Sequence, residues 1–68
     1  MRLTINGQQQ DSASSTLAQL IEHLGMKQDR VAVELNRNIV PRDQWAATNL
    51  AEGDQLEIVH FVGGGRVS

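Results

Sequence analysis

The feature that most restricts the fold is a single helical stripe set between segments in which apolar and polar residues alternate. Leucine and isoleucine recur at the spacing i, i+3, i+4 and i+7, which places on one face of a helix the side chains of Leu17, Leu20, Ile21 and Leu24. Thr16 is expected to cap the start of this helix, with Gln19 as its return partner, and Gly25 suits its C-terminal cap. We therefore predict a helix from residue 16 or 17 to residue 24 that packs on another layer.

Alternating residues before the helix predict a β-hairpin. Met1, Leu3 and Ile5 alternate with polar residues, which is the period of a strand with one buried face. Asn6-Gly7 is a strong signal for a two-residue turn between antiparallel strands. The polar segment 8–13 should then return as a short edge strand.

Three further apolar segments follow the helix. They predict strands over residues 31–35, 39–40 and 56–61, with Val31, Val33 and Leu35 pointing inward. Residues 42–48 should be irregular or form one tight helical turn, in which Trp45 covers one end of the core. The last strand is the most apolar, so we expect it at the centre of the sheet, covered by the helix on one face.

This order of elements predicts an α+β fold of the β-grasp type. A mixed sheet of four to five strands would pack on one helix, with the first and last strands parallel and adjacent at its centre. We expect the domain to comprise residues 1–62 and a flexible glycine-rich tail to comprise residues 63–68.

Size and composition favour binding or carrying over catalysis. The chain has 68 residues, a formal net charge of −2 and no cysteine, so we expect one small cytoplasmic domain without disulfides or thiolate metal sites. Six basic and eight acidic residues are spread along the chain and offer no basic stripe for nucleic acid. No apolar segment approaches the roughly 20 residues that a membrane helix requires.

A glycine triplet, Gly63-Gly64-Gly65, directly follows the last apolar segment. One interpretation is a frayed chain end, which is common in proteins. The other is a thread without Cβ atoms that enters a slot too narrow for side chains, as an enzyme that activates a protein's carboxyl end requires.

The residues resemble the ubiquitin-like sulfur carriers, and within them the carriers of thiamine biosynthesis. The resemblance covers nearly the whole chain and is carried by short segments: Asn6-Gly7, Thr16-Leu17, residues 31–36, residues 39–42, Gly53-Asp54 and residues 57–65. It implies that an E1-like (ThiF-like) adenylyltransferase uses ATP to activate the carboxylate of Gly65, which is then converted to a thiocarboxylate. Gly63 and Gly64 would form the thread, and the protein would be a co-substrate with no bound cofactor and no catalytic residue of its own.

The resemblance also implies further partners. A cysteine desulfurase or another sulfur donor system would supply the sulfur, and a thiazole synthase (ThiG-like) would receive it. Arg66-Val67-Ser68 follow Gly65, whereas members of the family typically end at the glycines, so a tail-trimming protease is expected.

Several side chains are weaker candidates for partner contacts. His60, Phe61 and Val62 adjoin the tail, and one of Phe61 and Val62 should face the core while the other contributes to an apolar docking patch. Exposed polar side chains usually interact with solvent, which is the first interpretation of Glu34, Asn36 and Arg42. The alternative is that these three residues contact a partner. His23 and His60 lie on different elements, so we expect no metal site.

Two other functions remain open at this level. The carrier could serve molybdopterin synthesis or tRNA thiolation, which use the same tail chemistry in related proteins. Alternatively the chain could be a noncovalent β-grasp interaction module whose glycines are the remnant of a linker.

Overall fold

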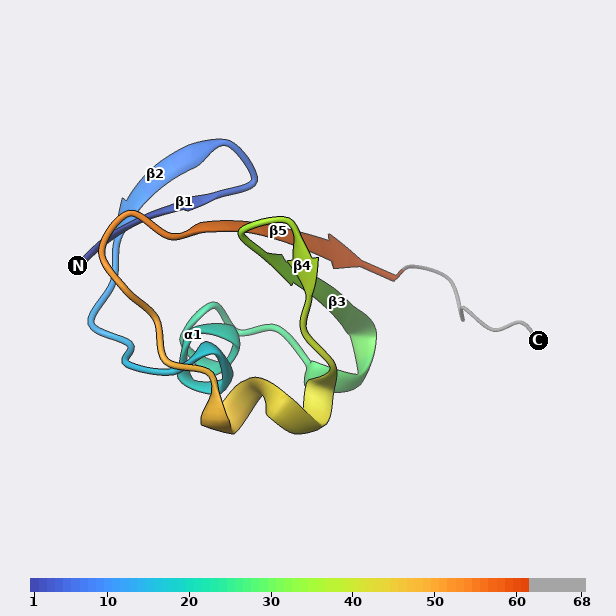
Figure 1. Cartoon of the computed structure of the whole chain (residues 1–68). Coiled ribbons are helices and arrows are strands. Elements are labelled where there is room, and N and C mark those ends of the chain that lie inside the picture. The colour runs from blue at the N-terminus through green and yellow to red at the C-terminus, as the bar shows by residue number, and fades with distance from the viewer. Residues whose placement is uncertain (62–68) are drawn as a thin grey trace.

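The computed structural model describes residues 1–61 of the 68-residue chain. The elements follow one another as β1 (Arg2–Ile5), β2 (Gln8–Asp11), α1 (Leu17–His23), η1 (Gln28–Arg30), β3 (Val31–Leu35), β4 (Asn38–Ile39), η2 (Arg42–Ala47) and β5 (Gln55–His60), as Figure 1 shows. The predicted site residues Val62, Gly63, Gly64 and Gly65 lie outside the described residues.

The five strands form one mixed sheet in the order β2-β1-β5-β3-β4. β1 and β5 are parallel, with Ile5 opposite Leu56, and β3 is antiparallel to β5 from the pair Val31 and His60 to the pair Leu35 and Leu56. The first and last strands are therefore neighbours and β5 is central, which confirms the predicted β-grasp arrangement. Among the strands of residues 1–61, the predicted edge strand β2 pairs with β1 alone, over four residues of each strand.

Both hairpins close through two-residue turns in which both residues have positive φ. Asn6 and Gly7 have φ of 50° and 83°, and Asn36 and Arg37 have φ of 51° and 73°. This conformation matches the right-handed twist of the strands that the turn joins, and asparagine tolerates it better than most residues. Asn-Gly predicted the first turn, and residues 36–38 have the composition of a turn as well. In the second turn Arg37 holds a left-handed conformation that is strained for a residue with a Cβ atom.

Helix α1 begins and ends where its caps predict. The Thr16 hydroxyl accepts a hydrogen bond from the backbone N–H of Gln19 at 3.2 Å, and Gly25 follows the helix with φ of 74°. The prediction that the Gln19 side chain returns to Thr16 was wrong: its Oε1 accepts from the backbone N–H of Ser15, at 2.9 Å.

The core lies between one face of the sheet and the layer formed by α1 and η2, which Figure 1 shows on the same side. Trp45 is 2% exposed, and its indole N–H donates to the backbone carbonyl of Val40 at 2.8 Å. It is thus a member of the core, which also contains Leu3, Ile5, Leu17, Leu20, Ile21, Val31, Val33, Leu50, Leu56 and Ile58. In the part of the chain that the structure describes, no helix is long and apolar enough to cross a membrane.

Candidate functional site

The central strand β5 leads directly toward the glycine triplet in the sequence. Its end is fixed by the backbone N–H of Phe61, which donates to the carbonyl of Arg30 at 2.7 Å. His60 lies opposite Val31 and is exposed, and the Phe61 side chain is 48% exposed. Both predicted contact residues are therefore accessible in the described chain, whereas their contacts with a partner stay a prediction. Phe61 is not buried in the core.

The side chain of Asn6 holds the other edge of β5. The backbone N–H of Ile58 donates to Asn6 Oδ1 at 2.7 Å, and Asn6 Nδ2 donates to the carbonyl of Ile58 at 3.2 Å. The backbone N–H of Asn6 also donates to the carbonyl of Leu56 at 2.9 Å. The amide therefore continues the β1–β5 ladder beyond the end of β1, so both edges of β5 are bonded close to its exit. This role was not predicted, because Asn-Gly explains the turn without it.

Three large apolar side chains are exposed near this end of the sheet: Ile39 is 74% exposed, Val59 is 58% exposed and Phe61 is 48% exposed. A cleft of about 260 Å³ is lined by Phe61, Val31, Pro41 and Trp45 among others. A second cleft of about 100 Å³ lies beside Ile39 and Val59. Both are smaller than the roughly 300 Å³ at which small-molecule pockets begin, so they suit side chains of a protein partner better than a cofactor. The consecutive apolar residues Ile58 and Val59, which must point to opposite faces, were the signal in the sequence for an apolar exposed face.

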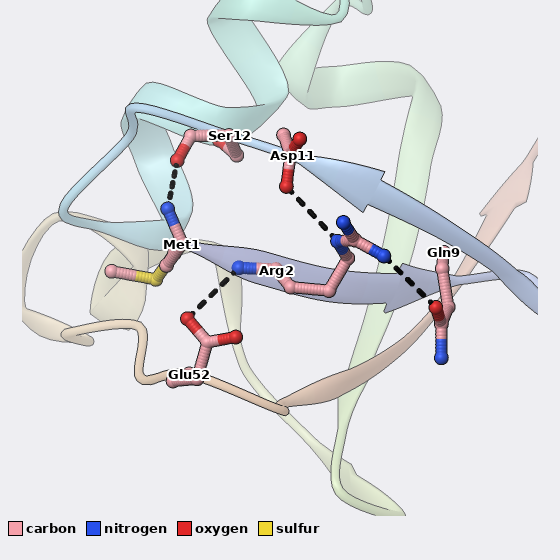
Figure 2. Close-up of polar contacts among 6 residues, drawn as sticks. All are labelled: Met1, Arg2, Gln9, Asp11, Ser12 and Glu52. Carbon is pink, nitrogen blue, oxygen red and sulfur yellow. Dashed lines mark hydrogen bonds and ion pairs between the residues drawn. The ribbon is translucent and has the colours of Figure 1, made fainter.

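The N-terminal hairpin presents a polar surface whose groups bond one another. Arg2 Nε donates to Asp11 Oδ1 at 3.0 Å, and a second guanidinium nitrogen donates to Gln9 Oε1 at 3.1 Å, as Figure 2 shows. The backbone N–H of Arg2 donates to Glu52 at 3.0 Å. These interactions join β1, β2 and the loop before β5, and they explain the polar residues here without a partner.

The described residues offer no assembled metal or acid-base site. Residues 1–61 contain no group of three or more histidine, aspartate or glutamate side chains arranged to hold a metal ion. His23 Nδ1 lies 2.6 Å from the hydroxyl of Ser14, which is 1% exposed, and so the ring satisfies a buried polar group. Because Ser14 is buried, this pair is a structural contact between the β2–α1 loop and the end of α1.

Comparison with known proteins identifies close relatives. The model of the ThiS family matches residues 3–65, a range that includes the glycine triplet. The sulfur carrier protein ThiS of Escherichia coli is 36% identical over 66 residues, which are 96% of this chain and 100% of that protein. A crystal structure of the thiamine biosynthesis protein ThiS from Geobacter metallireducens superposes with a TM-score of 0.80 at 33% identity, covering 96% of this chain and 100% of that one.

Two longer relatives contain a region similar to this chain. A thiazole synthase of Paramagnetospirillum magneticum is 47% identical over 66 residues, and one of Magnetococcus marinus is 42% identical over 67 residues. The alignments cover 96% and 97% of this chain, but the chain spans only 20% and 21% of the length of these two proteins.

Proposed function

Because the chain belongs to the ThiS family, we propose that it is a sulfur carrier protein of thiamine biosynthesis and that it carries sulfur on the carboxyl group of Gly65. The observation that carries the proposal is the family match over residues 3–65, which extends through all three glycines. The full-length similarity to the sulfur carrier protein of Escherichia coli supports it.

The proposed chemistry explains why the chain needs no nucleophile of its own. A carboxylate is a poor acyl donor, because it lacks a good leaving group. An E1-like adenylyltransferase would join the Gly65 carboxylate to AMP from ATP and release pyrophosphate. A sulfide equivalent from a cysteine desulfurase or another donor system would then attack the acyl carbon and expel AMP, leaving a thiocarboxylate. The step consumes ATP, which the cytoplasm supplies, and we propose that the reaction takes place there.

The acceptor that we propose is a thiazole synthase. The two longer relatives described above bear that name, and in each of them about one fifth of the polypeptide resembles this chain. A carrier and an acceptor that share one polypeptide act at high effective concentration, which suits a transfer between them.

The structure supports the proposal by the way in which it holds β5. The central strand is paired with β3 along its length and is bonded by the backbone and side chain of Asn6, and the residue after it, Phe61, donates to Arg30. A firmly held strand fixes the position from which the glycine triplet follows in the sequence. The exposed Phe61 and His60 adjoin that position and are the proposed contacts with partners, together with Val62.

Adenylation at Gly65 requires a free carboxylate. In the sequence the carboxyl group of Gly65 forms a peptide bond with Arg66, so we propose that a protease hydrolyses this bond before activation. Gly63 and Gly64 would then pass through the channel of the partner, where a Cβ atom would clash.

Intact mass spectrometry tests the proposal directly. The chain ending at Gly65 is incubated with ATP, the adenylyltransferase and sulfide, and it should gain the mass of one exchange of oxygen for sulfur. The control is a chain ending at Gly63, which retains the described fold residues and should remain unmodified. A chain ending at Gly65 that stays unmodified with an active adenylyltransferase would reject the carrier and favour a noncovalent interaction module.

A further inference from the structure

A small apolar cleft lies on the face of the sheet that α1 and η2 leave uncovered. We call this the open face, which lies away from α1 and η2 in Figure 1. Along β3 and β5 its residues alternate with buried core residues. Ala32 lies opposite Val59 in the pairing of β3 with β5, and Ile39 contributes from β4. These three residues and Glu34 and Glu57 line a cleft of about 100 Å³, and Val33, whose side chain belongs to the core, adjoins it.

Two carboxylates lie side by side at this cleft. Glu34 is directly opposite Glu57 in the antiparallel pairing of β3 with β5, and Ile39 is opposite Glu34 on its other side. Side chains opposite each other have Cβ atoms about 5 Å apart, and like charges at that distance destabilise a sheet. Both glutamates are exposed, and no ion pair within residues 1–61 involves either of them.

In the other half of the same sheet, the negative charge at a cross-strand position is balanced by a positive one. Arg2 on β1 is directly opposite Asp11 on β2, and the two side chains form an ion pair at 3.0 Å (Figure 2). At Glu34 and Glu57 the corresponding cross-strand pair has two negative charges, and no basic side chain of residues 1–61 forms an ion pair with either. The cleft therefore combines apolar walls with an unbalanced negative end.

An arginine side chain fits both properties. Its aliphatic stem can lie against Ala32, Ile39 and Val59, while its guanidinium remains at the polar end of the cleft. A guanidinium has five N–H donors in a planar fork and can bond two carboxylates at once, which a lysine ammonium matches less well.

We propose that this cleft binds an arginine side chain of the thiazole synthase that receives the sulfur. On the thiazole synthase this arginine would have apolar residues beside it. This inference rests on the proposed function, because it assigns a docking contact to the proposed acceptor. The thiazole synthase is the partner chosen because relatives of that name contain a region up to 47% identical to this chain. In the complex the guanidinium balances the two carboxylates, so the repulsion that the free carrier tolerates becomes attraction.

The test compares binding with stability in the chain ending at Gly65. Affinity for the thiazole synthase is measured by isothermal titration calorimetry for the unsubstituted chain and for the double variant Glu34→Gln and Glu57→Gln. The double variant should bind about tenfold more weakly or worse, because it lacks both charges that pair with the arginine. Its urea midpoint should be equal or higher, because the cross-strand repulsion is removed.

Two further variants separate charge from apolar contact. Glu22→Gln on the exposed side of α1 changes the net charge in the same direction and should leave the affinity unchanged. Ile39→Ser should weaken binding but retain its dependence on salt, whereas the double glutamine variant should lose most of that dependence.

The proposal is overturned if the double variant binds within about twofold of the unsubstituted chain, or if Glu22→Gln weakens binding equally. It is also overturned if the loss appears only with the adenylyltransferase. Thiocarboxylate formation is measured in parallel on every chain. A carrier that is loaded normally but binds thiazole synthase independently of Glu34 and Glu57 rejects the cleft alone, whereas an unsubstituted chain that is never loaded rejects the proposed function.

Discussion

Replacing Asn6 by glycine should show how much its side chain contributes to holding β5. The substitution removes the two hydrogen bonds to the backbone of Ile58, which are 2.7 and 3.2 Å long. Glycine adopts the φ of 50° at this position without strain, so the turn itself is preserved. The variant therefore isolates the amide's contribution to the central strand.

The expected loss is about 2 kcal/mol of unfolding free energy, since each of the two hydrogen bonds contributes about 1 kcal/mol net. Glycine stabilises the folded state because it relieves the positive φ, and it destabilises the folded state because glycine has a larger conformational entropy in the unfolded chain. The two effects are each at most about 1 kcal/mol and largely cancel. In a domain of this size a loss of about 2 kcal/mol lowers Tm by roughly 8–16 °C.

Urea unfolding followed by tryptophan fluorescence provides the assay. Trp45 is the one tryptophan in the chain and is 2% exposed, so its emission should report loss of the core. The matched control is Asn36→Gly, at the same turn position in the other hairpin with φ of 51°. Its side chain donates to Asp54 and accepts from the backbone N–H of Gln55, each at 3.0 Å, but both bonds are exposed, so the loss should stay below about 1 kcal/mol.

The reasoning would be refuted if Asn6→Gly lost no more stability than Asn36→Gly. A loss below about 0.5 kcal/mol would have the same meaning, because two part-buried backbone groups of Ile58 would then have found other partners at little cost.

Three further substitutions test separate parts of the argument. Arg37→Gly should raise the unfolding free energy by about 0.5–1 kcal/mol, because glycine relieves a φ of 73°, and a urea midpoint that does not rise would contradict this. Trp45→Phe should cost about 2 kcal/mol through the lost bond to Val40 and a small void, as measured by far-UV circular dichroism; a loss under about 0.5 kcal/mol would argue against a structural role for the indole N–H. Gly64→Ala should leave the urea midpoint unchanged and lower the yield of thiocarboxylate at Gly65, so equal yields from both chains would show that the partner's channel tolerates a Cβ atom.

Much of the fold was predictable because its signals are local. The stripe from Leu17 to Leu24 and the cap at Thr16 predicted α1, and Asn6-Gly7 predicted the first hairpin. The parallel pairing of β1 with β5 followed from the order of the elements and the apolar character of the last strand. Each of these predictions depended on spacing within a few residues or on a general rule of topology.

The features that escaped prediction depend on register between distant segments. Nothing near Glu34 in the sequence indicates that Glu57 lies opposite it, since a shift of the strands would pair it with another residue. The bond from Asn6 to Ile58 likewise joins residues far apart in the chain.

The 3-10 helix η1 was not predicted, because residues 28–30 carry no apolar period. For the glycine triplet, the sequence and the family match provide the evidence, because Gly63, Gly64 and Gly65 lie outside the described residues.

The central position of β5 has a consequence for how the protein is made. In the described part of the chain the sheet joins β1 to β3 through β5 alone, so its two halves cannot unite until the ribosome has released residues 55–60. Pairing between strands far apart in the sequence has a high contact order and is slow to form. The strand that leads to the proposed reactive glycines therefore reaches its native position in the same step that completes the domain. In an incomplete or misfolded chain β5 would not be paired in the sheet, so the glycines would not be held in position for the proposed partners.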